Sequence, residues 1–245
     1  MKTSKKRYPT FRVGITGGTG SVGLPLLIES AKKKFAGRGV LFIPEVATVF
    51  LAAGIEHPRA VPRQTQNLVS ASYQSSVGYT LFGLETYYAD LEYETGARIM
   101  LVERPLLDGA AFAGLSPEKF CEQCLPPALW MGKQLSSDEK VLKVFERYHT
   151  IIHLETHAAV NGEEYERIKK TLNPHNIDSA AEALAYDRAF LKIWKRHPRR
   201  IIIAASESLE RKEQLFNKQI EMLLNGTAPV SDKEEILERA VITGS

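Results

Sequence analysis

A glycine-rich segment, GITGGTGSVGLPLL at residues 14–27, is the part of the sequence best suited to bind a ligand. It follows an apolar, strand-like run and precedes a helical pattern. Backbone N–H groups at such a helix start can surround a phosphate group. The residues that we expect to form this anion-binding loop are Gly17, Gly18, Thr19, Gly20, Ser21 and Gly23.

One interpretation of the loop is a dinucleotide-binding fingerprint, T-G-x-x-G-x-x-G, beginning at Thr16. Tyr165 and Lys169 also form the Y-x-x-x-K pair of short-chain dehydrogenases, in which the lysine lowers the pKa of the proton-donating tyrosine. However, this pair lies in a charged segment that we expect to be an exposed helix. No acid ends the second strand to bind a ribose hydroxyl, because Pro44 stands there and Glu45 follows. An NAD(P)-binding oxidoreductase is therefore an alternative hypothesis.

The other interpretation is a P-loop, G-x-x-x-x-G-K-[ST], in which the lysine binds phosphate and the hydroxyl binds Mg²⁺. Counted from Gly18, the second glycine is Gly23, but Leu24 and Pro25 replace the lysine and the hydroxyl. Counting from Gly17 does not restore them either. Each lost charged hydrogen bond removes about 1.5–3 kcal/mol, so we expect weak triphosphate binding and slower phosphoryl transfer.

The rest of the chain has the pattern of an α/β protein. Five continuous apolar runs are separated by helical patterns, which indicates a parallel sheet covered on both faces. We therefore predict a three-layer sandwich with a five-stranded parallel sheet, and a long helix over residues 62–93, broken near Gly78 and Gly83. The predicted strands are residues 11–16, 39–44, 97–103, 150–156 and 199–205.

Five blocks outside the loop resemble the NadR/Ttd-type AAA domain, a P-loop family related to nucleoside kinases. The resemblance covers roughly residues 11–224, with the blocks in order. It implies a P-loop kinase-like fold with strand order 2-3-1-4-5, and a site for ATP or GTP with Mg²⁺. The blocks are residues 40–55, 98–112, 147–158, 173–206 and 209–220.

The resemblance also implies site residues beside the loop. Glu103 and Arg104 match an acid–arginine pair that, in an active relative, holds Mg²⁺ or accepts a proton and contacts substrate. The family more often has Asp there, and Glu is one methylene longer. Glu45 and Asp108 match the second-substrate side, although Asp108 beside Gly109 also has the pattern of a turn residue. His175 and Asn176 stand where the family often has a basic residue.

The charge distribution divides the chain into three parts. Residues 1–10 form a basic N-terminal arm, residues 11–225 the P-loop NTPase-like domain, and residues 226–245 a C-terminal appendage. We expect protein partners that bind the arm and the appendage, with an acidic membrane surface as a further option. The formal net charge of +3 is too small to indicate a nucleic-acid partner.

Other residues with chemical potential have simpler explanations. His149, His153 and His157 recur every fourth residue, but around an expected strand, where such neighbours lie about 13 Å apart. We therefore predict no metal site. Cys121 and Cys124 form a lone C-x-x-C, which favours free thiols in a reducing compartment.

These observations favour a P-loop protein with a degenerate Walker A motif and a binding, regulatory or structural role in a larger assembly. We expect it in the cytoplasm, with a cytoskeletal or ciliary assembly as one location. One alternative is an active ATP- or GTP-dependent kinase or NTPase, in which Lys32–Lys34 or another basic residue reaches the phosphates. The other is the oxidoreductase.

Overall fold

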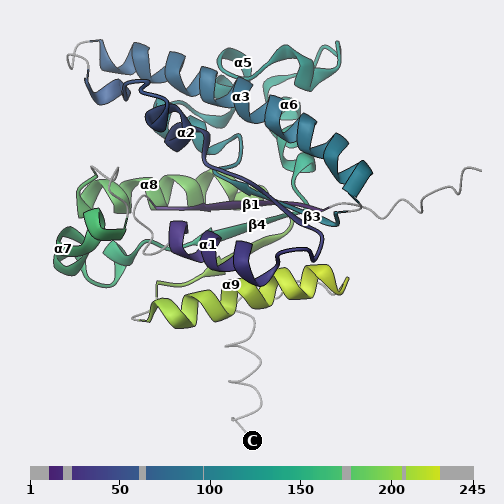
Figure 1. The fold of residues 1–245 in the computed structure, drawn as a ribbon. Helices are drawn as coiled ribbons and strands as arrows, with labels where there is room; N and C mark the ends of the chain where they lie inside the picture. Colours follow the sequence, from purple (N-terminus) through teal and green to yellow (C-terminus); the bar gives the residue numbers. More distant parts are fainter. Residues whose placement is uncertain are drawn as a thin grey trace, which may run out of the picture.

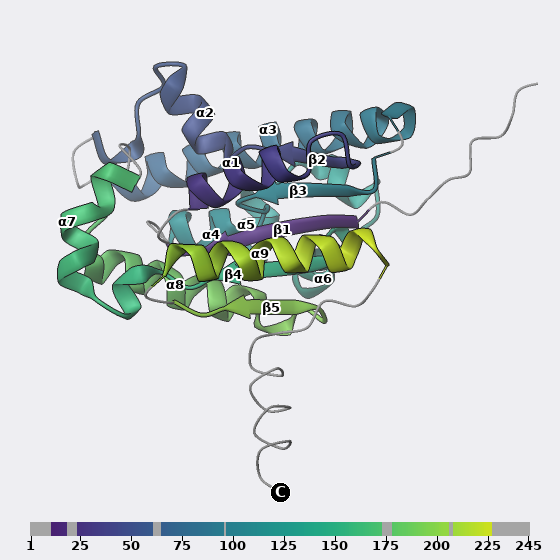
Figure 2. The ribbon, with the colours of Figure 1, turned by 60° about the horizontal axis from the view of Figure 1, so that its bottom comes forward.

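The protein is built around one five-stranded parallel sheet. The structure is a computed structural model that describes residues 11–18, 24–60, 65–95, 97–172, 178–205 and 208–226, with the backbone alone for 67, 92–95 and 170–172. The sheet order is β2-β3-β1-β4-β5, and all four strand pairs are parallel (Figure 2). The strands are β1 (Phe11–Gly17), β2 (Val40–Ile43), β3 (Ile99–Glu103), β4 (Thr150–Leu154) and β5 (Arg200–Ile203).

Helices cover both faces of this sheet and form a three-layer sandwich. Figure 1 shows α1 and α9 below the sheet, with α3 and α8 among the helices above it. The helices are α1 (Leu24–Lys34), α2 (Val46–Ala52), α3 (Gln66–Thr95), α4 (Asp108–Ala113), α5 (Pro117–Gln123), α6 (Ser137–Arg147), α7 (Gly162–Leu172), α8 (Ala180–Ile193) and α9 (Leu209–Leu224), with short 3₁₀ turns η1 (Pro58–Ala60), η2 (Pro127–Trp130), η3 (His157–Ala159) and η4 (Trp194–Arg196).

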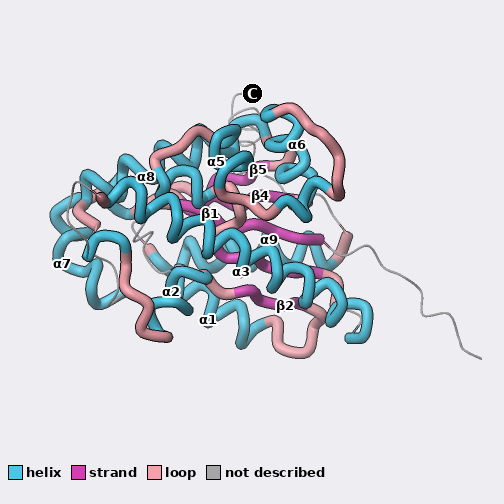
Figure 3. Tube along the Cα trace, turned by 90° about the horizontal axis from the view of Figure 1, so that it is seen from above, coloured by secondary structure: helices cyan, strands magenta, loops and turns pink. Residues whose placement is uncertain are grey.

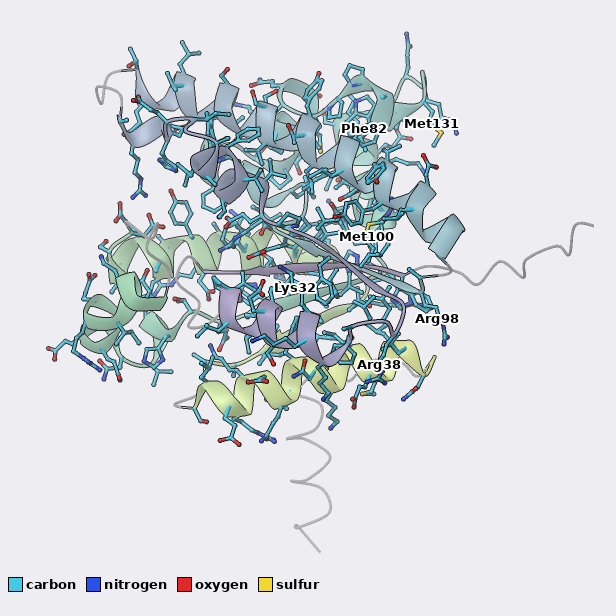
Figure 4. All side chains as sticks on the ribbon, in the orientation of Figure 1. Lys32, Arg38, Phe82, Arg98, Met100 and Met131 are labelled. Carbon is cyan, nitrogen blue, oxygen red and sulfur yellow. The ribbon has the colours of Figure 1, made fainter. Side chains whose placement is uncertain are left out.

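The five predicted strands are confirmed, and so is the three-layer sandwich. Their apolar runs are continuous because each strand packs side chains on both faces. Met100 and Val102 of β3 point into the core between the sheet and the layer of α3 and α4, whereas Ile99 and Leu101 point into the core between the sheet and α1 and α9. Figure 4 shows Met100 between the sheet and the upper helix layer, and the exposed Met131 at the outer surface.

The strand order separates the two interpretations of the glycine-rich loop. β3 lies between β1 and β2, which is the order that the kinase-like sandwich predicts. A dehydrogenase of the Rossmann type places its second strand directly beside its first. The topology therefore argues against the fold on which the oxidoreductase hypothesis depended.

The long helix α3 is continuous, so the predicted break near Gly78 and Gly83 is wrong. Gly78 has a packing role instead. A Cβ there would lie 3.0 Å from the Leu125 Cδ2 atom, so the glycine allows the segment after α5 to approach the helix closely. Figure 3 shows α3 as a long rod that lies across the sheet.

Among the described residues, no helix combines the length and the apolar character that crossing a membrane requires.

Two helical glycines should respond in opposite ways to alanine. At Gly109 in α4, a Cβ would meet the buried Phe120 ring, 2.4 Å from its Cζ atom. Overpacking of this kind costs about 1–3 kcal/mol, so we expect Gly109→Ala to lower the free energy of unfolding, measured by urea titration. The matched control is Gly83→Ala, where nothing lies within 4 Å. It should raise the free energy by about 0.5–1 kcal/mol. Equal effects of the two substitutions would contradict this packing.

Candidate functional site

The carboxyl ends of the strands bring most of the predicted site residues together. Gly17 ends β1 and Glu103 ends β3, and the two strands are paired in register with Ile15 opposite Glu103. Glu45 follows β2 and precedes α2. Ligands of open parallel sheets bind at this edge, because the loops after the strands converge there.

The guanidinium group of Arg104 links these loops. It donates a hydrogen bond to the carbonyl oxygen of Gly17, and its nitrogens lie 3.6 Å from carboxylate oxygens of Glu45 and of Asp108. The Arg104 backbone has a φ of 58°, in the left-handed region that is uncommon for residues other than glycine. The side chain is only 10% exposed. The arginine expected to contact substrate is therefore engaged with the protein itself.

Aromatic rings complete the surroundings of this guanidinium. The Arg104 Cζ atom lies 5.7 Å from the ring centre of Phe112 and 5.1 Å from that of Phe190. Cations are attracted to the faces of such rings, and the attraction grows when water is excluded. These contacts come from α4 and α8, so they fix the arginine between the sheet and the upper helix layer.

Asp108 is the buried centre of a second set of contacts. Its Oδ2 accepts a hydrogen bond from the Thr16 hydroxyl at 2.7 Å, and its Oδ1 accepts one from the Trp194 indole at 2.7 Å. Burial raises the pKa of Asp108 to about 6, although Arg104 opposes the shift. Both oxygens are engaged inside the protein and the residue is 1% exposed. A second substrate would have to displace these contacts to reach the carboxylate.

Glu103 and Glu45 form a pair of acids at the edge. The backbone N–H of Glu45 donates to Glu103 Oε2 at 3.3 Å, and the Thr48 hydroxyl donates to Glu45 Oε2 at 2.8 Å. Burial and the charge of Glu45 raise the pKa of Glu103 to about 7, while the Arg104 charge lowers it. A carboxyl group with such a pKa can accept or release a proton at neutral pH.

Asp187 in α8 binds the start of the glycine-rich loop. Its Oδ1 accepts hydrogen bonds from the Gly18 N–H at 2.7 Å and the Thr156 N–H at 3.2 Å, and lies 3.2 Å from His153 Nε2. A Cβ on Gly18 would lie 2.7 Å from the Thr156 Cβ, which explains the glycine. The first N–H group after β1 therefore faces a carboxylate.

Lys212 in α9 is a buried cation at the same edge. It is 1% exposed, and its Nζ donates to the carbonyl oxygen of Glu155 at 2.7 Å. Burial lowers its pKa to about 8, against the charges of Glu155 and Asp187. We did not predict Lys212 or Asp187, since each lies in a helix whose local pattern carries no sign of a site.

Part of the predicted loop lies outside the described residues, namely Thr19, Gly20, Ser21 and Gly23. The same holds for residues 1–10 and 227–245, and for His175 and Asn176. The helix after the loop is described: Leu24 is buried in the core between the sheet, α1 and α9, and Pro25 is the second residue of α1.

Two of the lysines at the other end of α1, Lys32 and Lys34, have acidic partners there. Lys32 donates to Glu29 Oε1 at 2.6 Å, and the Lys34 Nζ lies 3.3 Å from Glu221 Oε1 in α9. Figure 4 labels Lys32 on α1. These ion pairs lie along the helix surface and offer no support for a role at the loop.

The Y-x-x-x-K pair has structural contacts. The Tyr165 hydroxyl and the Lys169 ammonium both donate to the carbonyl oxygen of Asp178, at 3.4 and 2.8 Å. The expectation that this pair is exposed was wrong for Tyr165, which is fully buried. Its ring packs against Ala183 of α8.

Metal ligands do not gather in the described part of the chain, where no group of three or more His, Cys, Asp or Glu residues could hold an ion. His153 lies within β4 and His149 and His157 flank it, as the strand prediction implied. Cys121 and Cys124 are free and buried.

The buried Asp108 generates a pH prediction. Its pKa is about 6 in the folded protein against 3.8 in the unfolded chain, so folding favours the protonated form. The contribution of Asp108 to the free energy of unfolding is fully present below about pH 4. It falls by about 2–3 kcal/mol as the pH rises to 6. The amide in Asp108→Asn does not titrate in this pH range. The stability of the wild type relative to this variant should therefore fall between pH 4 and 6 in urea titrations.

The matched control is Asp138→Asn, which removes an exposed carboxylate paired with Arg196. That pairing lowers the pKa of Asp138, so its effect has the opposite sign. Parallel pH curves for the wild type and Asp108→Asn would show that Asp108 does not take up a proton on folding.

Comparison with known proteins does not assign the chain to a family. No family model matches the chain, and no curated protein matches it. The fold and the contacts above are therefore the basis for any functional proposal.

Proposed function

We propose that this chain is a P-loop-fold protein with a degenerate Walker A motif, which acts as a non-catalytic binding, regulatory or structural subunit of a larger assembly. The observation that carries the proposal is the side chain of Leu24. It stands where one register of the motif requires lysine, and it is buried in the core between α1, α9 and the sheet. A lysine there would have to turn its charged end away from that core.

Two further features weaken a phosphate site at the loop. Pro25 removes a backbone N–H from the first turn of α1, where such groups bind anions. The carboxylate of Asp187 accepts from the Gly18 N–H, which places negative charge beside the loop. Losing the lysine and the Mg²⁺-binding hydroxyl together corresponds to about 3–6 kcal/mol. At about 1.4 kcal/mol per tenfold change, triphosphate affinity falls at least a hundredfold.

The cations at this edge support a structural use of the site. Arg104 is bound to the Gly17 carbonyl oxygen and lies beside Asp108. Lys212 is bound to the Glu155 carbonyl oxygen. A group that binds substrate in a kinase must be able to leave its protein partners, and both of these cations are buried among theirs. Partners of the protein would instead bind the basic arm and the C-terminal appendage.

One observation favours the alternative of an active small-molecule kinase. The carboxyl group of Glu103 has a pKa of about 7 and lies at the end of β3 beside Glu45. That is a suitable general base for a substrate hydroxyl, and such bases contribute a factor of about 10²–10⁴ in rate. Phosphoryl transfer would then depend on the main-chain groups of the loop and on Mg²⁺ held by these acids.

Calorimetric titration of the full chain with ATP and GTP, with and without Mg²⁺, tests the leading proposal. We expect dissociation constants no tighter than the millimolar range and little effect of Mg²⁺, because the motif lacks its metal-binding hydroxyl. Micromolar, Mg²⁺-dependent binding accompanied by turnover would refute the proposal and favour the kinase. In that event Glu103→Gln should lower the turnover number by about 10²–10⁴.

Restoring the motif offers a gain-of-function test. The double variant Leu24→Lys/Pro25→Ser creates G-x-x-x-x-G-K-S from Gly18 onward. A lysine can bury its stem and extend its charge to the loop, so we expect triphosphate binding to tighten by about 10²–10⁴ and to become Mg²⁺-dependent.

Leu24→Met/Pro25→Ala is the matched control, since it keeps an apolar residue at position 24 and supplies no hydroxyl. Circular dichroism and the melting temperature establish that both variants fold. A folded Lys/Ser variant that binds triphosphate no better than the control would show that the loop is not a Walker A descendant.

A further inference from the structure

A basic pocket lies at the opposite end of the sheet from the glycine-rich loop. It has a volume of about 640 Å³, within the range of pockets for small molecules. It is formed where β1, β4 and β5 begin, beside the end of α6, which Figure 2 shows next to the sheet. Its lining residues are Phe11, Arg12, Leu142, Phe145, Glu146, Arg147, Tyr148, His149, Arg196, Pro198 and Arg199.

The pocket carries an excess of positive charge. Arg12 and Arg147 share one buried acid: Arg147 donates two hydrogen bonds to Glu85, and an Arg12 nitrogen lies 4.0 Å from it. Two guanidinium groups therefore face one carboxylate. The acid on the pocket wall, Glu146, is paired with Lys143.

Arg199 adds a second excess charge. It donates to the Nε2 atom of His149, and within the described part of the chain it makes no ion pair with an acid. His149 does not compensate it, because burial and the Arg199 charge lower the pKa of the imidazole. Arg196 differs, since it forms a two-point pair with Asp138 at 2.6 and 3.2 Å.

The floor of the pocket is fixed by buried contacts. The Tyr148 hydroxyl donates to Glu85 Oε1 at 2.6 Å and accepts from the Leu106 N–H at 3.0 Å. His197 lies 3.0 Å from the Tyr148 carbonyl oxygen and 2.9 Å from that of Arg199. These contacts hold the backbone at Tyr148 and Arg199, on both sides of the pocket.

The wall offers an apolar surface as well. The rings of Phe11 and His149 lie with their centres 4.2 Å apart, and Leu142 is 40% exposed. Guanidinium groups bind phosphate and carboxylate oxygens in pairs, while apolar walls accommodate the body of an organic ligand. The small net charge of the chain does not favour a nucleic acid here.

We propose that this pocket is a second ligand site, distinct from the glycine-rich loop, for a small organic anion that carries at least two phosphate or carboxylate groups. The two excess charges, near Glu85 and at Arg199, set the minimum number of anionic groups.

Calorimetric titration of the full chain with pyrophosphate and with citrate, at low ionic strength, tests the site. The two probes distinguish phosphate from carboxylate recognition. We expect submillimolar binding of at least one of them and a loss of at least tenfold in Arg199→Ala. Arg199→Lys keeps the charge without the paired donors, so its anion affinity should lie between those of the wild type and Arg199→Ala. Arg38→Ala removes an arginine elsewhere, beside Glu221, and should bind like the wild type.

The side-chain NMR resonance of His149 localises the binding. Addition of the anion should shift it in the wild type and in Arg38→Ala, whereas Arg199→Ala should need at least tenfold more anion for the same shift. Arg199 is exposed, so its replacement should not prevent folding. Failure of both probes to bind the wild type, or equal binding by folded Arg199→Ala, would overturn the proposal. Anion binding that leaves the His149 resonance unshifted would also overturn it.

Discussion

The hydrogen bond from Arg104 to the Gly17 carbonyl oxygen is the contact on which the carboxyl edge of the sheet depends. It binds the turn after β3 to the last residue of β1, and the same guanidinium lies beside Glu45 from the β2 turn. The unusual backbone conformation of Arg104 directs its side chain back across the sheet. Three loops that are distant in sequence are therefore held by one buried cation.

This arrangement leaves the edge rich in acids. Two buried cations lie among acids at this edge: Arg104 beside Glu45 and Asp108, and Lys212 near Glu155 and Asp187. Glu103 adds a further carboxyl group there. Burial raises the pKa values of Glu103 and Asp108, and the charge of Glu45 raises that of Glu103 further, so protons carry part of the missing positive charge. A P-loop needs the reverse balance, with positive charge and free N–H groups directed at a phosphate. Leu24, which stands where the proposed motif would have lysine, supplies no positive charge to offset these acids.

The sequence predicted the parts of this structure that depend on local pattern. Each strand is a continuous apolar run, which the two-sided burial of a parallel sheet imposes. Glu103 and Arg104 could be placed at the edge because they directly follow such a run. The predicted strand order came from the resemblance to a known family, because an apolar run does not indicate which strands lie beside it in the sheet.

The remaining contacts join residues far apart in the chain, and their residue types are ordinary in their local setting. Asp187 lies in a helix of mixed polarity, 169 positions from the Gly18 that it binds. The prediction that Tyr165 is exposed was wrong for a related reason. Its neighbours in α7 are mostly charged, but the Tyr165 ring itself packs against Ala183 of α8.

The two ends of the sheet therefore have opposite electrostatic character. Acids predominate where the strands end, and arginines predominate where β1, β4 and β5 begin. The buried Glu85 shows why the basic end is stable: it satisfies Arg147 and Tyr148, while Arg12 stays 4.0 Å away, with its side chain 24% exposed to solvent. The buried Glu85 thus positions Arg147 without neutralising all the arginines at this end. An anion that approaches this fold meets attraction at the amino end and repulsion at the end where the glycine-rich loop begins.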